Sequence, residues 1–137
     1  MSACPDENEF KYGPNQNNPT PDIKWRELLK SYEGVGPPES MINPHAHHIV
    51  FKKGRGVKMK GYLDESKKIL EKYDIDWYKG RENLIWAPNK NHSTIAAKYV
   101  RDVLIQADKT NSKEEVVLAL RNAGDLFAKD KFNGNKT

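Results

Sequence analysis

The stretch His45-Ala46-His47-His48-Ile49-Val50-Phe51 decides what fold the chain is expected to have. Three of the four histidines fall in its first four residues, and an apolar run follows them directly. Because β-branched and aromatic residues are enriched in strands, the sequence predicts a short strand over residues 48–51. Successive side chains of a strand point to opposite faces, so His47 and His48 can enter one site only if the backbone bends where the strand begins. The residues around Ala46 leave room for that bend.

Two adjacent imidazoles suit two different roles at one site. A neutral imidazole can bind a divalent metal ion, and an uncoordinated neighbour can take a proton from water. Hydrolysis of a phosphodiester needs such a base, a cation on the phosphate and stabilisation of the leaving 3'-oxygen. His92 is the candidate second metal ligand, because we expect it in the first turn of a helix. Asn83 and Asn89 bracket a predicted strand and can either lock the loop that carries the base or complete the metal shell; locking is the role we expect of Asn83.

Basic residues follow the histidines at once, and five of them lie within nine residues: Lys52, Lys53, Arg55, Lys58 and Lys60. The net charge of +4 is compatible with polyanion binding. We expect the first four to bind nucleic acid through its phosphates, and a solvated loop that needs charge for solubility is the alternative. Cys4 is the only cysteine, which excludes a disulfide framework and a cysteine-based zinc site. A metal must therefore use histidine, asparagine or carboxylate ligands.

The rest of the chain predicts a single α+β domain over residues 23–137. Residues 1–22 are rich in proline and asparagine and predict a disordered leader or linker. Apolar residues recur at helical spacing in four segments, near residues 23–32, 62–73, 95–104 and, after a capping box from Ser112 to Glu115, 112–129. A second short strand is predicted over residues 84–86. No apolar run approaches the roughly 20 residues that a bilayer span requires, so we expect no membrane anchor.

Three segments together resemble the AHH family of predicted toxin nucleases: Ala46-His47-His48-Ile49-Val50, then Glu82 to Asn89, then Asn91-His92-Ser93 with Tyr99 and Val103. The resemblance covers about residues 41–107. It implies the ββα-metal core of the His-Me finger superfamily, which includes the HNH and endonuclease VII-like enzymes, flanked here by an N-terminal and a C-terminal helix. It also implies roles for four residues. His48 is then the general base, His47 a metal ligand, Asn83 the central asparagine of the HNH pattern, and His92 the helix-borne second ligand.

One position departs from the wider superfamily. Colicin-like members have a further histidine four residues after the helix ligand, and this chain has Ala96 there. The comparison implies two protein nitrogen ligands completed by water, with Mg²⁺ as the expected ion and Mn²⁺, Ni²⁺ or Zn²⁺ as alternatives. We do not expect Asn89 or Asp102 to substitute, since Asp102 lies about 15 Å from His92 along a helix that rises 1.5 Å per residue.

The resemblance also implies a biological setting. Such domains are usually C-terminal parts of bacterial polymorphic toxins, made in the bacterial cytoplasm, secreted within a larger protein, active in the target-cell cytoplasm and neutralised by a cognate immunity protein. We therefore expect a divalent-metal-dependent endonuclease of little sequence specificity that acts on DNA. An RNase of the same fold, and a nucleic-acid-binding module that holds a metal without turnover, are the alternatives. His45 is expected to be structural, and the three tryptophans to serve in packing, with base stacking as the alternative.

Overall fold

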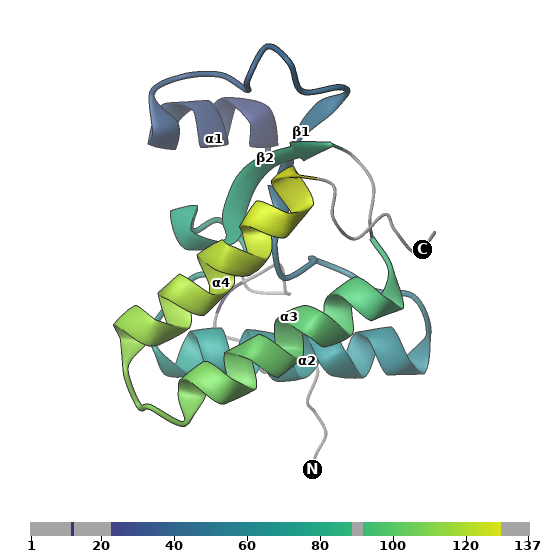
Figure 1. Cartoon of the computed structure of the whole chain (residues 1–137), viewed down its shortest axis with the longest axis vertical. Helices are drawn as coiled ribbons and strands as arrows, with labels where there is room; N and C mark the ends of the chain where they lie inside the picture. The colour runs from purple at the N-terminus through teal and green to yellow at the C-terminus, as the bar shows by residue number, and fades with distance from the viewer. Residues whose placement is uncertain (1–11, 13–22, 89–91, 130–137) are drawn as a thin grey trace.

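The computed structural model describes residue 12 and residues 23–88 and 92–129. In chain order the elements are α1 (Trp25–Glu33), β1 (Pro44–His48), α2 (Gly56–Lys72), the 3-10 turn η1 (Arg81–Asn83), β2 (Leu84–Pro88), α3 (Thr94–Asp108) and α4 (Lys113–Ala128). Figure 1 shows α2 and α3 side by side, with α4 extending from α3 to the strands and α1 lying beyond the strands. The described chain is therefore mixed α+β, as the sequence predicted. None of its helices combines the length and apolar character that a membrane span needs.

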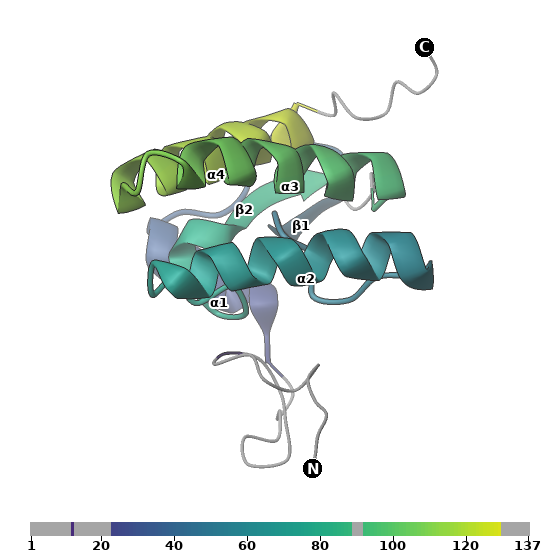
Figure 2. The same ribbon diagram turned by 90° about the horizontal axis from the view of Figure 1, so that it is seen from below.

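The two strands pair antiparallel to form a two-stranded sheet that lies between α4 and α1 (Figure 2). His48 pairs with Leu84 at one end of the ladder and Pro44 pairs with Pro88 at the other. Because side chains alternate along a strand, Leu84 and Trp86 pack with Leu29 of α1. The opposite face of β2 contributes to the larger core between the strands and α2, α3 and α4. The histidines of β1 thus lie between two separate packing surfaces.

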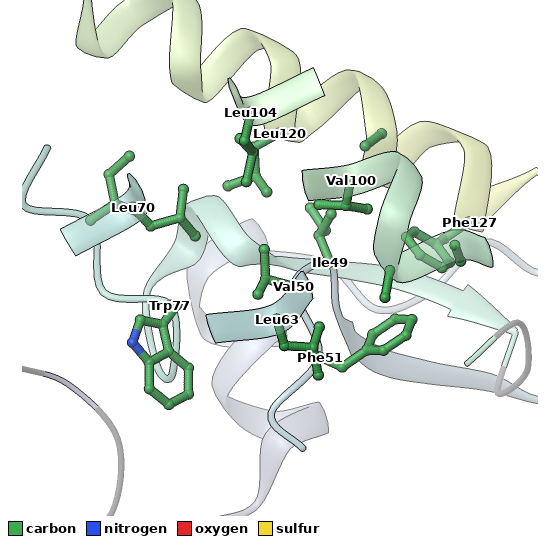
Figure 3. Packing of buried hydrophobic residues seen from close by; sticks show 14 of the residues in the cluster. Ile49, Val50, Phe51, Leu63, Leu70, Trp77, Val100, Leu104, Leu120 and Phe127 are labelled. Carbon is green, nitrogen blue, oxygen red and sulfur yellow. The ribbon is translucent and has the colours of Figure 1, made fainter. Parts of the chain in front are cut away.

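The apolar run that follows His48 is buried without forming a strand. The prediction of a strand over residues 48–51 was wrong, because β1 ends at His48 and residues 49–51 bend into the core. Figure 3 shows their side chains among those of α2, α3 and α4: Leu63, Leu70, Val100, Leu104, Leu120 and Phe127. Their backbone groups bond to Asn83 instead of to a strand partner, with Ile49 N 2.9 Å from Asn83 O. Burial alone therefore explains the apolar character of this run.

Two helix starts differ from those predicted. α2 begins at Gly56 rather than near residue 62, so the basic residues after the glycines lie on its first turns. α3 begins at Thr94, and Ser93 is its N-cap, with Oγ accepting a hydrogen bond from Ala96 N at 3.0 Å. His92 therefore precedes the helix by two residues, and its predicted place in the first turn was wrong. At the start of α4 the predicted cap is present, since Ser112 Oγ accepts from Glu115 N at 3.2 Å.

α4 holds the segments that carry the histidines and Asn83. A Cβ atom built on Gly124 would lie 2.6 Å from Ile49 Cδ1, so the absence of a side chain lets α4 pack directly on the residue after His48. Arg121 binds the same end of the sheet, where Leu84 pairs with His48. Its Nη1 donates to the carbonyl oxygens of Arg81, Glu82 and Leu84 at 3.2, 3.1 and 2.8 Å. One helix thus fixes both the end of β1 and the beginning of β2.

Tyr12 belongs to the segment that the sequence assigned to a leader outside the core, yet it packs against the core cluster. Its backbone N donates to Glu71 Oε2 at 3.0 Å, and its hydroxyl donates to Asp74 Oδ1 at 2.9 Å. This residue is therefore bound to the C-terminal end of α2.

Candidate functional site

A pocket of about 480 Å³ opens beside β1. It is lined by α1, β1, the segment after the strand and the residue before Ser93: Trp25, Arg26, His45, Ala46, His47, His48, Phe51, Lys52, Lys53 and His92. The pocket brings together all three histidines to which the sequence gave a role, and two of the predicted phosphate contacts. Its described lining holds three cations, Arg26, Lys52 and Lys53, and no carboxylate. This charge pattern favours an anionic ligand.

His47 and His48 contact this pocket from opposite faces of β1. The sequence made a shared site conditional on a bend at the beginning of the strand, whereas β1 pairs regularly from Pro44 to His48 and the chain bends directly after it. The His47 ring lies on the α4 side, with its centroid 4.6 Å from that of Phe127. The His48 ring lies on the α1 side, 4.7 Å from Trp25 in an edge-to-face contact. Both rings line one pocket because they are the last two residues of the strand, where the chain leaves the sheet.

His48 is buried, with 6% of its surface exposed, and a backbone oxygen fixes its tautomer. Nε2 lies 2.8 Å from Tyr78 O, which can only accept, so Nε2 carries the proton and Nδ1 carries the lone pair. Burial lowers the pKa of His48 to about 3, against the opposing effect of the Tyr78 hydrogen bond and with a smaller contribution from nearby Lys52. The ring is therefore neutral at pH 7. A neutral, oriented imidazole with its lone pair on Nδ1 can accept a proton.

Asn83 locks the chain that follows His48. Its side chain is fully buried, and Oδ1 accepts from Val50 N at 2.8 Å while Nδ2 donates to Val50 O at 3.0 Å and to Trp77 O at 2.7 Å. The amide thereby pairs Val50 as a neighbouring strand would, and it also ties down the residue before Tyr78. Of the two roles that the sequence left open for Asn83, locking is the one for which its hydrogen bonds are arranged.

His47 and His92 form a pair of stacked rings, with centroids 4.5 Å apart and planes inclined by 10°. His47 Nδ1 donates to His48 O at 2.8 Å, which leaves the lone pair on Nε2. His92 is exposed but rests on one side against His47 and Phe51. Desolvation, with a smaller contribution from His45, lowers the pKa of His92. The lowered pKa of His92 favours the neutral form that metal binding needs.

Two ring nitrogens, one from His47 and one from His92, are the donors that this part of the pocket could offer to a divalent ion. The described residues contain no cluster of three or more histidine, cysteine, aspartate or glutamate side chains that could hold a metal. A lone pair lies in the plane of its ring, so rings stacked with their planes inclined by 10° must rotate substantially before both nitrogens can meet one ion. Asp102 is engaged elsewhere, since it accepts from Lys98 Nζ at 3.0 Å and from Arg101 Nε at 2.8 Å. Asn89 lies outside the described residues.

The predicted basic residues divide into two groups. Lys52 and Lys53 line the pocket, and Lys52 Nζ lies 4.8 Å from the centroid of the Trp25 ring. Arg55 and Lys58 are exposed at the start of α2 and do not line it. His45, which we expected to be structural, is part of the pocket lining.

The sequence missed three contributors to the site, and one of them is Arg26, which lines the pocket as its third cation. Trp25, expected in packing, closes the α1 side of the pocket against the His48 ring. Tyr78 acts through its backbone carbonyl, to which no side-chain pattern points. Of these contributors, Trp25 had the clearest sequence signal, because it is an aromatic residue on the apolar face of the helix predicted near residues 23–32.

The chain matches no protein-family model, no curated protein and no solved structure. The resemblance to AHH nucleases thus depends on the short motifs around the histidines. The chemistry of the pocket has to carry the functional conclusion.

Proposed function

We propose that the chain is a divalent-metal-dependent endonuclease that hydrolyses phosphodiester bonds, with DNA as its preferred substrate. The observation that carries this proposal is the composition of one pocket. A buried histidine with a fixed tautomer lies beside the stacked rings of two further histidines, and the described lining is cationic without a carboxylate. Base, ion ligands and anion-attracting field are the three things that phosphodiester hydrolysis requires.

His48 acts as the general base in this proposal. The Tyr78 carbonyl holds the Nε2 proton, so Nδ1 takes a proton from a water molecule, and the resulting hydroxide attacks phosphorus. A pKa of about 3 describes the free protein, and a base is most effective when its pKa is near the operating pH. A phosphate in the pocket would raise the pKa of His48, because an anion stabilises the imidazolium. Substrate binding thereby strengthens the base that the substrate needs.

His47 and His92 would hold the divalent ion through one ring nitrogen each, once their stacked rings have rotated toward it. When bound, such an ion neutralises the phosphate and stabilises the leaving 3'-oxygen. Imidazole ligands suit Ni²⁺ and Zn²⁺, whereas a shell completed largely by water and phosphate oxygens suits Mg²⁺ and Mn²⁺. We retain Mg²⁺ as the expected ion, and weak retention follows for any of them because only two protein ligands take part.

The remaining residues bind and position. Lys52, Lys53 and Arg26 attract the phosphates around the scissile bond, with Arg55 and Lys58 contacting the backbone farther out along α2. Asn83 keeps the segment after His48 in place. Trp25 keeps one side of the His48 ring dry and fixes its plane.

We further propose that β1, β2 and α3 constitute a ββα-metal core into which α2 is inserted, with α1 and α4 as additions. The order of strand, strand and helix, and the location of the histidines at the end of β1 and just before α3, support this assignment. The same proposal includes the role of a toxin domain that is secreted within a larger protein and neutralised by an immunity protein. An acidic inhibitor that covers the cationic pocket would suit the charge.

A nuclease assay tests the proposal. Plasmid DNA and purified tRNA are incubated side by side with the protein in Mg²⁺, Mn²⁺, Ni²⁺ or Zn²⁺, and in EDTA. We expect metal-dependent nicking and linearisation of the plasmid that EDTA abolishes. Cleavage of tRNA alone would move the substrate to RNA within the same chemistry. Nucleic-acid binding without cleavage in any ion would overturn the endonuclease and favour the metal-holding module.

A further inference from the structure

A second pocket of about 300 Å³ lies next to the first and shares two of its residues. It is lined by Lys52, Lys53, Gly54, Lys60, Leu63, Asp64 and Lys67. Lys52 and Lys53 belong to both pockets, so the two hollows are neighbours across the segment that follows Phe51. The far wall of the second pocket is a single face of α2, because residues 60, 64 and 67 recur at the spacing of one helix face.

The lining of this second pocket is strongly cationic. It contains four lysines and one aspartate, a formal charge of +3 (four minus one) around a small volume. Burial lowers the pKa of Lys67, the nearby Asp64 carboxylate opposes this shift, and the charge on Lys60 adds a smaller lowering. Like charges gathered at one place repel each other, and an anion between them removes that repulsion. The empty pocket therefore has a net positive charge, which a bound anion would offset.

Lys67 gives the pocket a fixed inner wall. Its side chain is buried, with 7% exposed, and Nζ donates to Lys52 O at 2.8 Å while lying 4.2 Å from the centroid of the Trp77 ring. This hydrogen bond ties α2 to the backbone of Lys52, one of the two residues that the pockets share. The lysines of the segment after Phe51 are thus held at a defined place between the pockets, and do not belong to a freely solvated loop.

We propose that the second pocket binds a backbone phosphate of the nucleic acid, neighbouring the phosphate that is cleaved in the first pocket. The inference rests on the proposed function for the identity of the ligand, and on the shared lysines for the continuity of the two sites. Lys60 makes the contact that is specific to the second pocket, with Lys52 and Lys53 bridging both. Asp64 weakens the site, because a carboxylate in the lining repels a phosphate.

Binding of a short fluorescein-labelled DNA duplex, measured by anisotropy in EDTA and in a His48→Ala background, tests the proposal while the DNA stays intact. Each phosphate contact contributes about 0.9 to the slope of log K against log salt. We expect Lys60→Ala to lower the magnitude of this slope by about 0.9. If the variant and the parent bind equally at 1 M salt, this change in slope makes the variant bind about eightfold more weakly at 0.1 M salt. Asp64→Asn is expected to tighten binding. Lys68→Ala, which removes an exposed lysine of the same helix outside both pockets, is the matched control.

The outcomes separate this proposal from the endonuclease. If Lys60→Ala behaves like Lys68→Ala in affinity and slope, or if Asp64→Asn weakens binding, the second phosphate site is refuted even in a protein that cleaves DNA. If Lys60→Ala and Asp64→Asn shift binding as expected while the parent cleaves nothing in any divalent ion, the phosphate site stands and the endonuclease fails.

Discussion

Replacing Asn83 by alanine removes the amide that fixes the segment after His48. Three hydrogen bonds disappear, to Val50 N, Val50 O and Trp77 O, at a residue with no exposed surface. Each buried backbone group that loses its partner costs about 1 to 3 kcal/mol, and water can re-enter some of the space. We therefore expect Asn83→Ala to lower the free energy of unfolding by about 3 to 5 kcal/mol, a large part of the roughly 5 to 15 kcal/mol of a typical domain.

Equilibrium unfolding in urea, followed by tryptophan fluorescence, measures this change. With an m-value of about 1.5 kcal/mol per M, the midpoint should fall by about 2 to 3 M. The control is Asn122→Ala, at an exposed asparagine of α4, for which a change below about 0.5 kcal/mol is expected. At temperatures where Asn83→Ala remains folded, its nuclease rate should fall about 100-fold, since displacement of a base by about 1 Å has such an effect.

Asn83→Asp distinguishes the donor role of the amide from its shape. The aspartate keeps an oxygen that accepts from Val50 N. When it is ionised, however, it has no proton to donate to the carbonyl oxygens of Val50 and Trp77. Burial raises its folded pKa above the unfolded value of about 3.9, so the folded state holds the extra proton and stability should rise as the pH falls from 7 to 5. A loss of less than 1 kcal/mol in Asn83→Ala, or an Asn83→Asp variant as stable as the parent at pH 7, would refute the locking role.

Three further changes test the packing around the site. Gly124→Ala should destabilise the fold by about 1 to 3 kcal/mol because its Cβ meets Ile49 Cδ1, and adding Ile49→Val, which removes that atom, should recover part of the loss in urea unfolding; no recovery would disprove the contact. Arg121→Met keeps the apolar stem but leaves three carbonyl oxygens without their donor, and a melting temperature equal to that of the parent would contradict the expected cost of about 2 kcal/mol. Burial lowers the pKa of Lys67 from 10.5 to about 8, so between these values the unfolded chain holds more protons and the parent gains stability as the pH rises. In Lys67→Met the urea midpoint should not rise between pH 8 and 10 as it does in the parent. A rise equal to that of the parent would show that Lys67 does not cause it.

The sequence predicted which histidines come together better than it predicted the backbone that carries them. Histidines 47, 48 and 92 line one pocket, as expected, and the roles assigned to them stay predictions. The strand was predicted over residues 48–51, but residues 49–51 are buried after a bend in which the side chain of Asn83 bonds both backbone groups of Val50. Sequence periodicity reports burial, and it cannot show that a side-chain amide has replaced a neighbouring strand.

The positions of His92 and Tyr78 illustrate two other limits. Ser93 is a good N-cap residue, and reading it as the cap would have placed His92 outside the helix. Nothing in the sequence indicates that the carbonyl of Tyr78 orients His48, because every residue has such a carbonyl and only the fold selects one. The basic residues show a similar limit. Arg55 and Lys58 were predicted to contact phosphate because they lie close to the histidines in sequence, whereas Lys60 and Lys67 line the second pocket because they share one face of α2.

The rate at which His48→Ala cuts plasmid DNA tests the central claim most directly. The variant is compared with the parent and with Lys68→Ala in Mg²⁺ and in Mn²⁺, after urea unfolding has shown that each is folded. A general base contributes about 10² to 10⁴ in rate, so the account predicts a loss of at least 100-fold in His48→Ala and none in Lys68→Ala. A folded His48→Ala protein that cuts DNA as fast as the parent would contradict it.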